Sequence, residues 1–343
     1  MLLGENRDKN NTNIMEANVF REFFGGIIDY AGMFPPAELT LSKAFRNYIG
    51  YLESEDKWMM SKFVCSVKSF LEIFGKNSES GKLVHNYHGS RWIDFSLLSS
   101  GGNTPKDFKN SLEKECREIK KIIEEHTEKI SVDAFEVKIQ PDLVGSFGNH
   151  ALKKLLGETD DIINSNGLTG IRVYIEPPVG DKYKTIFSKS AEAAAESCHH
   201  GGRVGFKLRT GGVTADAFPT IEQVAYALNV CFENRIQFKA TAGLHHPVRH
   251  YNRSVNTKMH GFLNVFGAGI LRHANTLSLN ELEDIISDET STSFIFSDDT
   301  FYWNDIPADI TKTVKARAEF VKSFGSCSFD EPRDDLKKLG LWF

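Results

Sequence analysis

Short apolar runs of strand length alternate along this chain with longer amphipathic stretches. Within the short runs, β-branched and aromatic residues alternate with polar ones, which is typical of strands with two different faces. Strands are predicted over residues 26–31, 62–67, 91–98, 134–139, 171–176, 204–209, 237–242 and 293–298. Eight strands separated by helices predict a parallel sheet, which closes most naturally into a single (β/α)8 TIM-type barrel of the α/β class.

Helix start signals support the stretches between these runs. Thr104 precedes Pro105 at the start of one helix, and Thr220 with Gln223 forms a capping box at the start of another. Helices are predicted over 104–126, 149–164, 182–199, 220–234 and 313–324.

These elements predict a simple domain organisation. We expect residues 15–343 to form one barrel domain with a short C-terminal helical extension, after a polar, disordered lead at residues 1–14. The alternative is an open doubly wound sheet, but no G-x-G-x-x-G motif follows the first predicted strand.

The composition of the chain argues against several classes of binding partner. The formal net charge of −5 and the lack of a Lys/Arg run give no reason to expect a nucleic-acid partner. Five cysteines without a C-x-x-C pair argue against a disulfide framework and a zinc ribbon. Without a membrane-length apolar stretch or a signal peptide, we expect a cytoplasmic protein without a membrane partner, and a homo-oligomer stays open.

The inner faces of the predicted strands are unusually polar. The outer face must be apolar because helices cover it, and the residues on the opposite face are Asp94, Ser96, Glu136, Lys138, Gln140, Arg172, Tyr174, Glu176, Lys207, Arg209, Gln237, Lys239 and Thr241. A lone buried charge costs several kcal/mol, so these groups must pair, meet water or bind a ligand. A self-satisfied ion network is one interpretation. We favour a pocket at the carboxyl ends of the strands, where barrel active sites lie.

Two lysines in this set suggest a reaction. Lys207 and Lys239 lie near the ends of neighbouring predicted strands, and two close cations lower each other's pKa. A neutral lysine can attack a carbonyl carbon and form a Schiff base. The alternative is that either lysine only forms a salt bridge, to Glu176 or Asp94.

Other polar residues complete the predicted site. Glu176, held before two prolines, and Asp29, at the end of the first strand, are the predicted proton-transfer groups. Arg209 and the nearby glycines suit a small anionic metabolite. The predicted substrate-binding residues are Arg209, Thr210, Gly211, Gly212, Thr241, His245, His246 and Lys138.

The lysine motifs also carry a resemblance. Lys207-x-x-Thr210-Gly211 and Lys239-x-x-Ala242-Gly243 resemble the sixth- and seventh-strand lysines of class I aldolases of the deoxyribose-phosphate aldolase type, and Ile28-Asp29-Tyr30 is loosely similar to that family's first strand. The resemblance implies Lys207 as the Schiff-base lysine and Lys239 as its pKa-lowering neighbour.

The chain departs from that pattern in two places. Where the family has an acidic proton shuttle in the fourth strand, this chain offers Glu136 and Lys138, and Arg209 with the His245-His246 pair is additional. Phosphosugar specificity therefore stays open. Separately, residues 238–247, 259–266 and 324–330 resemble an uncharacterised bacterial family, which implies no activity.

The preferred hypothesis is a Schiff-base carbon–carbon lyase acting on a small oxo or phosphorylated acid, with no cofactor. Two alternatives remain open. His245, His250 and either Asp298 or Asp299 could hold a divalent metal in a lyase or hydrolase. The third interpretation is a barrel that binds a metabolite without turning it over.

Overall fold

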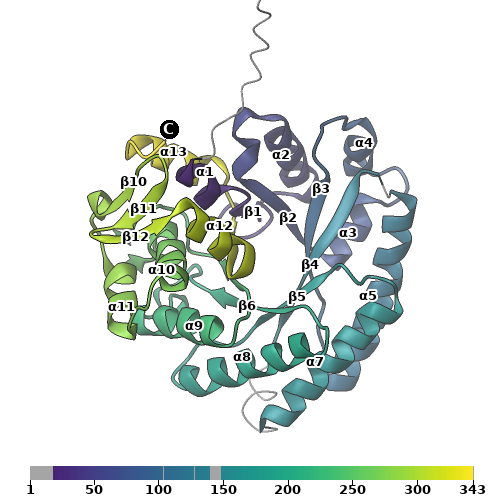
Figure 1. Cartoon of the computed structure of the whole chain (residues 1–343). Coiled ribbons are helices and arrows are strands. Elements are labelled where there is room, and N and C mark those ends of the chain that lie inside the picture. The colour runs from purple at the N-terminus through teal and green to yellow at the C-terminus, as the bar shows by residue number, and fades with distance from the viewer. Residues whose placement is uncertain (1–17, 103, 127, 140–147, 343) are drawn as a thin grey trace, which may run out of the picture.

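Eight parallel strands close into a barrel in the computed structural model, which describes residues 18–342 apart from 103, 127 and 140–147 (Figure 1). The barrel strands are β1 (Ile28–Tyr30), β2 (Met60–Ser66), β3 (Ile93–Leu98), β4 (Ile130–Lys138), β5 (Arg172–Glu176), β6 (Val204–Arg209), β7 (Phe238–Thr241) and β13 (Val321–Ser326). β13 closes the barrel by pairing with both β7 and β1. The predicted TIM-type barrel is confirmed, while the expected lead at residues 1–14 lies outside the described residues.

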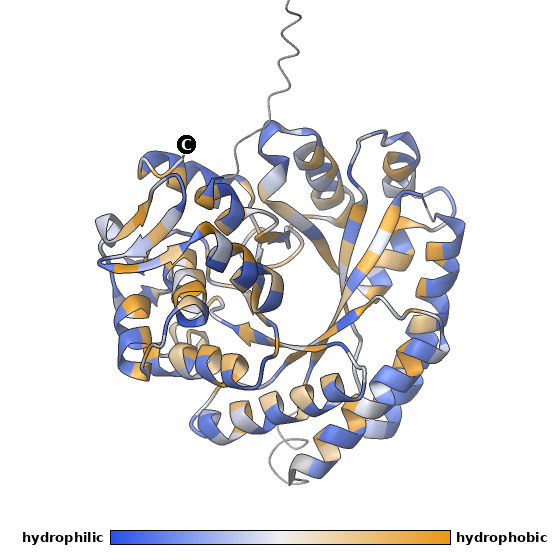
Figure 2. Cartoon of the chain, in the orientation of Figure 1, coloured by the Kyte–Doolittle hydropathy of each residue, from blue (hydrophilic) through white to orange (hydrophobic). Residues whose placement is uncertain are grey.

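Helices surround this barrel. In Figure 2 the helices of the ring carry hydrophobic residues on the side of the strands and hydrophilic residues outside. They are α1 (Val19–Phe24), α2 (Leu41–Glu53), α3 (Val67–Ile73), α4 (Glu79–Asn86), α5 (Pro105–Glu125), α7 (Gly148–Ser165), α8 (Tyr183–His199), α9 (Ile221–Glu233), α10 (Phe262–Ala274), α11 (Leu279–Ser287), α12 (Ile310–Glu319) and α13 (Asp330–Lys338). The last of these is the predicted helical extension, and Thr220 and Gln223 form the predicted capping box of α9.

The predicted eighth strand is wrong. Residues 293–298 contain β10 (Phe294–Phe296), which pairs antiparallel with β11 (Thr300–Trp303) in a small sheet completed by β12 (Ile306–Asp309). The predicted helix over 313–324 is also wrong in its second half, because α12 ends at Glu319 and β13 follows.

The long connection between β7 and β13 explains the error. It also contains the hairpin of β8 (His250–Asn252) and β9 (Thr257–Met259), so it holds several strand-like runs that do not enter the barrel. Phe320 and Phe324 are four residues apart, a helical spacing, and this spacing conceals the strand that begins at Val321.

The core and the interior of the barrel have opposite character. Phe206 and Phe238 are fully buried on the outer faces of their strands, and Phe206 packs edge-on against Phe187 of α8 at 5.4 Å. Lys207 and Lys239, one position further along, are equally buried but point inward. The predicted polar inner face is therefore confirmed for these strands.

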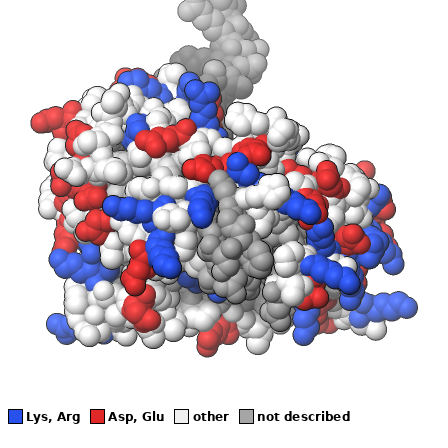
Figure 3. All heavy atoms as spheres, turned by 90° about the horizontal axis from the view of Figure 1, so that it is seen from below, with Lys and Arg blue, Asp and Glu red and all other residues white. Residues whose placement is uncertain are grey.

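The outer surface has mixed charge. Acidic and basic side chains are interspersed on the face shown in Figure 3. Among the described helices, none combines the length and the apolar character that a membrane crossing requires.

Candidate functional site

Two buried lysines lie side by side inside the barrel. Lys207 of β6 and Lys239 of β7 are direct partners in the parallel register, and the two residues are 2% and 1% exposed. Because their chain neighbours are apolar and face the helices, strand alternation turns both lysines toward the barrel axis. The predicted proximity of the two lysines is confirmed.

Three carboxylates hold these lysines. Lys207 Nζ lies 2.6 Å from Glu136 Oε2 and 2.7 Å from Glu176 Oε2. Lys239 Nζ lies 2.7 Å from Asp29 Oδ2 and is also paired with Glu136. Glu136 of β4 is thus shared by both ammonium groups.

Arg209 extends the arrangement toward the end of β6. Its Nε lies 2.8 Å from Glu176 Oε1, so cations and anions alternate in the order Asp29, Lys239, Glu136, Lys207, Glu176, Arg209. We refer to these six residues as the ion-pair network. Each of its five buried charges, three carboxylates and two lysines, has an oppositely charged partner, and the exposed Arg209 supplies the third positive charge.

The network changes the expected protonation of its members. Burial alone would raise the pKa of Glu136, but Lys207 and Lys239 outweigh it and hold this pKa well below its usual range. Burial likewise favours neutral Lys239, but Asp29 and Glu136 outweigh it and raise the Lys239 pKa above its ordinary value. The expectation that the second cation depresses the pKa of its neighbour is wrong for Lys239, because it left out the carboxylates.

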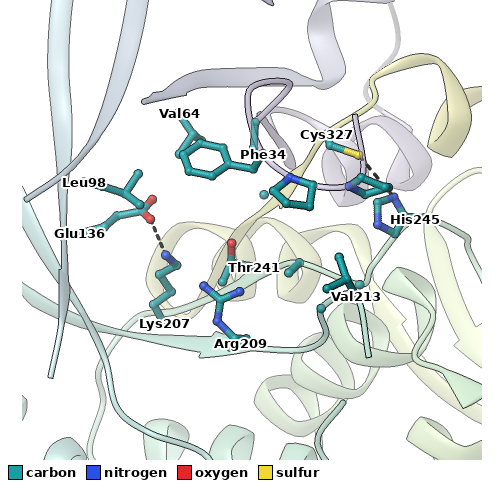
Figure 4. Close-up of a pocket in the computed structure, with 17 residues that line it drawn as sticks. Phe34, Val64, Leu98, Glu136, Lys207, Arg209, Val213, Thr241, His245 and Cys327 are labelled. Atoms are coloured by element: carbon teal, nitrogen blue, oxygen red, sulfur yellow. Dashed lines mark hydrogen bonds and ion pairs between the residues drawn. The ribbon is translucent and has the colours of Figure 1, made fainter. Parts of the chain in front are cut away.

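A cavity of about 240 Å³ opens above the network at the carboxyl ends of the strands (Figure 4). Lys207, Glu136 and Arg209 line this cavity, whereas Asp29, Glu176 and Lys239 are not among the residues that line it. Its apolar wall is made by Phe34, Pro35, Pro36, Val64, Leu98 and Val213. Lys207 therefore borders the cavity while Lys239 lies behind it.

A second group of titratable residues lies across the cavity from Lys207 (Figure 4). Cys327, just after β13, has its Sγ 4.0 Å from His245 Nδ1, and that nitrogen is 3.2 Å from Glu331 Oε2 of α13. Burial lowers the pKa of His245, but Cys327 and Glu331 outweigh burial and raise it to about 9. His245 is therefore an imidazolium cation at neutral pH.

Some of the other predicted substrate-binding residues line the cavity, and others join the ends of neighbouring strands. Gly212 and Thr241 line the cavity with His245. Thr210 instead donates to the Thr241 carbonyl oxygen at 3.1 Å, joining the ends of β6 and β7. Gly211 is in the same close contact, because a Cβ on it would lie 2.7 Å from the Gly243 Cα.

Lys138 and His246 lie outside the cavity. Lys138 is exposed at the end of β4, and His246 pairs through Nδ1 with Asp335 of α13 at 2.5 Å. Neither is among the residues that line the cavity.

Sequence reasoning missed two residues of the site. The alternation along 134–139 predicts that Glu136 faces inward but gives it no role, because its contact with the two lysines spans the barrel. The sequence does not indicate Cys327, because its place in the site depends on β13, and residues 321–324 of that strand are predicted as helix.

The alternative metal set is not brought together. Asp298 lies in the turn between β10 and β11, where its carbonyl accepts the Val19 N–H at 3.1 Å. His250 lies in β8, with its Nδ1 3.1 Å from the Val248 carbonyl oxygen. Across the part of the chain that the structure describes, no group of three or more His, Cys, Asp or Glu side chains is placed to hold a metal ion. The described residues therefore give no support to the set of His245, His250 and Asp298 or Asp299 as a metal site.

Comparison with known proteins finds only distant structural likeness. No family model matches the sequence, and no curated protein matches it. A deoxyribose phosphate aldolase from Aeropyrum pernix is 13% identical, with a TM-score of 0.43 over 67% of this chain and 86% of its own. The 3-keto-D-glucoside 4-epimerase of E. coli is 11% identical, with a TM-score of 0.42 over 92% and 99% of the two chains.

An intracellular xylanase from Thermoanaerobacterium saccharolyticum is 8% identical, with a TM-score of 0.42 over 92% of this chain and 91% of its own. The expected similarity to a deoxyribose-phosphate aldolase is thus found. At these values the similarities concern the fold alone, and the chemistry has to be argued from this chain's own residues.

Proposed function

We propose that this chain is a Schiff-base carbon–carbon lyase acting on a small oxo or phosphorylated acid, with Lys207 as the nucleophile. The observation that carries the proposal is that Lys207 borders the cavity beside the carboxylate of Glu136, whereas Lys239 lies behind them. A buried amine next to a proton acceptor in a cavity is the arrangement that imine formation requires.

Glu136 is the group we assign to proton transfer at Lys207. Its Oε2 is 2.6 Å from Lys207 Nζ, so it is placed to pass the ammonium proton on to the substrate carbonyl oxygen, which leaves as water. Because its pKa is held low, Glu136 returns to the carboxylate form after each transfer. The neutral amine adds to the substrate carbonyl carbon, and loss of water gives the iminium. A base then removes the proton of the β-hydroxyl group, the carbon–carbon bond breaks, and its electron pair moves into the iminium to form an enamine while an aldehyde leaves. Protonation of the enamine carbon and addition of water release the second product and restore the lysine.

Lys239 and Asp29 are positioning residues in this scheme. The raised pKa of Lys239 keeps it an ammonium, and its charge favours the ionised form of Glu136. Ser96 donates to Glu136 Oε1 at 2.6 Å and fixes the carboxylate further. Asp29 holds Lys239 from the other side, and Glu176 holds both Lys207 and Arg209.

The cavity supports a small anionic substrate. Arg209 points into the cavity between Lys207 and His245 (Figure 4). Its ion pair with Glu176 uses Nε, and among the described residues its terminal nitrogens make no ion pair. Its terminal nitrogens can therefore meet a carboxylate or phosphate, and the imidazolium of His245 adds a second positive charge. A volume of about 240 Å³ suits a compound of a few carbon atoms.

Reductive trapping tests the proposal. The intact protein is incubated with borohydride and either pyruvate or dihydroxyacetone phosphate, and the adduct is located by peptide mass mapping. We expect one adduct, on Lys207. Lys207→Arg keeps a cation between Glu136 and Glu176 but cannot form an imine, so it should remain folded and lose the adduct.

Lys138→Met is the matched control, because Lys138 is an exposed lysine at the end of a barrel strand. It should trap as the unchanged protein does. An adduct on a lysine other than Lys207, or none with any oxo or phosphorylated acid, would overturn the assignment. Saturable binding of such acids without trapping or turnover would support the metabolite-binding alternative instead.

A further inference from the structure

A second cavity, of about 350 Å³, lies at the opposite end of the barrel from the catalytic pocket. The N-terminal ends of β2 and β13 form one side, and α1 and α12, which pack against each other, form the other (Figure 1). Four cations line this cavity, namely Arg21, Lys62, Arg317 and Lys322, and Glu22 is the one carboxylate among its lining residues.

These cations lack the carboxylate partners found in the ion-pair network. None of Lys62, Arg317 and Lys322 makes an ion pair with the described residues. Arg317 donates to backbone carbonyls, including that of Gly25 at 2.9 Å, and Lys322 Nζ donates to the Arg317 carbonyl at 2.7 Å. Lys62 Nζ has Ser61 Oγ at 3.1 Å. Carbonyl dipoles and a hydroxyl hold these groups in place without neutralising them.

The positive charges that line this cavity lower the pKa of one of their own number. Burial, followed by the charges of Arg317 and Lys62, lowers the pKa of Lys322 to about 8. Asp29 and Asp94 offset this positive charge only in part. Asp29 is already engaged by Lys239, and burial together with Asp133 raises the pKa of Asp94 to about 6. A bound anion would relieve the repulsion between the cations.

We infer that this cavity is a binding site for a small phosphoryl dianion, either inorganic phosphate or a phosphate monoester. The ammonium groups of Lys62 and Lys322 supply directed donors and charge. The cavity has room for a phosphate group with a short organic substituent. The charge excess distinguishes this site from the catalytic pocket, where Glu136 and Glu176 offset the cations.

The site is also connected to the ion-pair network. Ser323, which lines the cavity, donates to Asp29 Oδ2 at 2.7 Å, and the Lys62 N–H donates to Asp29 Oδ1 at 3.2 Å. Asp29 is the residue that pairs with Lys239. A ligand bound here therefore lies one residue away from the network, as an effector site would.

Calorimetric titration of the full chain at pH 7 tests the inference, with inorganic phosphate and glycerol phosphate as separate probes. We expect one saturable site, bound at least about tenfold more weakly by Lys62→Met and by Lys322→Met, because each removes a charged donor. Lys312→Met, an exposed lysine of the same helix as Arg317 that does not line the cavity, should bind as the unchanged protein does. Tighter binding of the monoester would identify an organic phosphate as the ligand, and equal binding would identify phosphate itself.

A second measurement separates this site from the catalytic pocket and does not depend on a stable variant. At pH 8 a lysine with a pKa near 8 is about half neutral and reacts with amine reagents, so phosphate should protect Lys322 from labelling mapped by mass spectrometry. Arg209→Met should keep this protection. The inference would be overturned by an absence of saturable binding, by unchanged binding in both lysine variants, or by protection that disappears only in Arg209→Met.

Discussion

Replacement of Lys239 by methionine should reveal how the interior charges are balanced. The substitution keeps an unbranched side chain, one atom shorter, and removes one cation that is paired with both Asp29 and Glu136. Glu136 keeps Lys207 at 2.6 Å, but Asp29, which is fully buried, keeps only hydrogen bonds from Ser323 and the Lys62 N–H. The variant therefore leaves one buried carboxylate without its ion-pair partner.

The expected loss of unfolding free energy follows from the unpaired carboxylate. Removing one partner of a buried ion pair costs about 3–5 kcal/mol, because the remaining charge stays desolvated. Since domains are stable by only about 5–15 kcal/mol, the variant should unfold at a clearly lower urea concentration. Lys258→Met, which breaks an exposed pair with Glu289, is the control and should cost about 0–1 kcal/mol.

The pH dependence gives the sign of the effect. In the unchanged protein Lys239 and Lys62 overcome burial and lower the pKa of Asp29, so this group stabilises the fold above the unfolded pKa and loses that contribution as the pH falls. In Lys239→Met burial dominates and Asp29 is protonated more readily in the folded state. The difference in unfolding free energy should thus be largest near pH 7 and shrink toward pH 4.

The double variant Asp29→Asn with Lys239→Met supplies the decisive comparison. It removes one anion and one cation, so it should be more stable than Lys239→Met alone. Urea unfolding followed by circular dichroism measures all the variants. A loss below about 1 kcal/mol in Lys239→Met, or no recovery in the double variant, would refute the argument that charge balance holds this interior together.

Two further outcomes follow from local contacts. Glu331→Gln removes the carboxylate beside His245, so the pKa of His245, followed by NMR, should fall from about 9 toward about 6.5. Asp334→Asn in the same helix is the control and should leave the pKa of His245 unchanged. The stability that the contact between His245 and Glu331 adds is fully present below about pH 6.5 and disappears as the pH rises through about 9. A pKa of His245 that is the same in Glu331→Gln would rule out the contact. Thr220→Ala should lower the free energy of unfolding by about 1 kcal/mol, because the Thr220 side chain caps α9. Thr40→Ala, at an N-cap whose side chain makes no such hydrogen bond, should lower it by only a few tenths of a kcal/mol. Equal losses of stability in thermal or urea unfolding would contradict this account.

Most of the barrel could be predicted because its strands carry local signals. Residues 204–209 form β6 with the predicted bounds, since Val204, Phe206 and Leu208 face the helices while the residues between them face inward. β13 carries a conflicting signal, because Phe320 and Phe324 fit a helix as well. Its true place depends on pairing with β1, almost the whole chain length away, and no local pattern contains that pairing.

The site could be predicted along the strands but not across the barrel. The adjacency of Lys207 and Lys239 follows from neighbouring parallel strands and is confirmed. The contact of both lysines with Glu136 spans the barrel axis from β4 to β6 and β7, and depends on which side chains reach across it. For the same reason the expected fall in the pKa of Lys239 was wrong: the cations could be counted from the sequence, but their distances to the carboxylates could not.

The polar interior has a consequence for communication between the two ends of the barrel. Branched apolar layers, which fill ordinary barrels, would separate the cavity beside Lys207 from the opposite end. Here Asp29 is held from one end by Ser323 and the Lys62 N–H and from the other by Lys239, so polar contacts of a single residue connect the two ends. Charges in a buried, poorly screened environment act on one another over longer distances than they do in water. A change in charge at Lys62 or Lys322 should therefore alter the hold on Asp29, and through it the ammonium that sits behind Lys207.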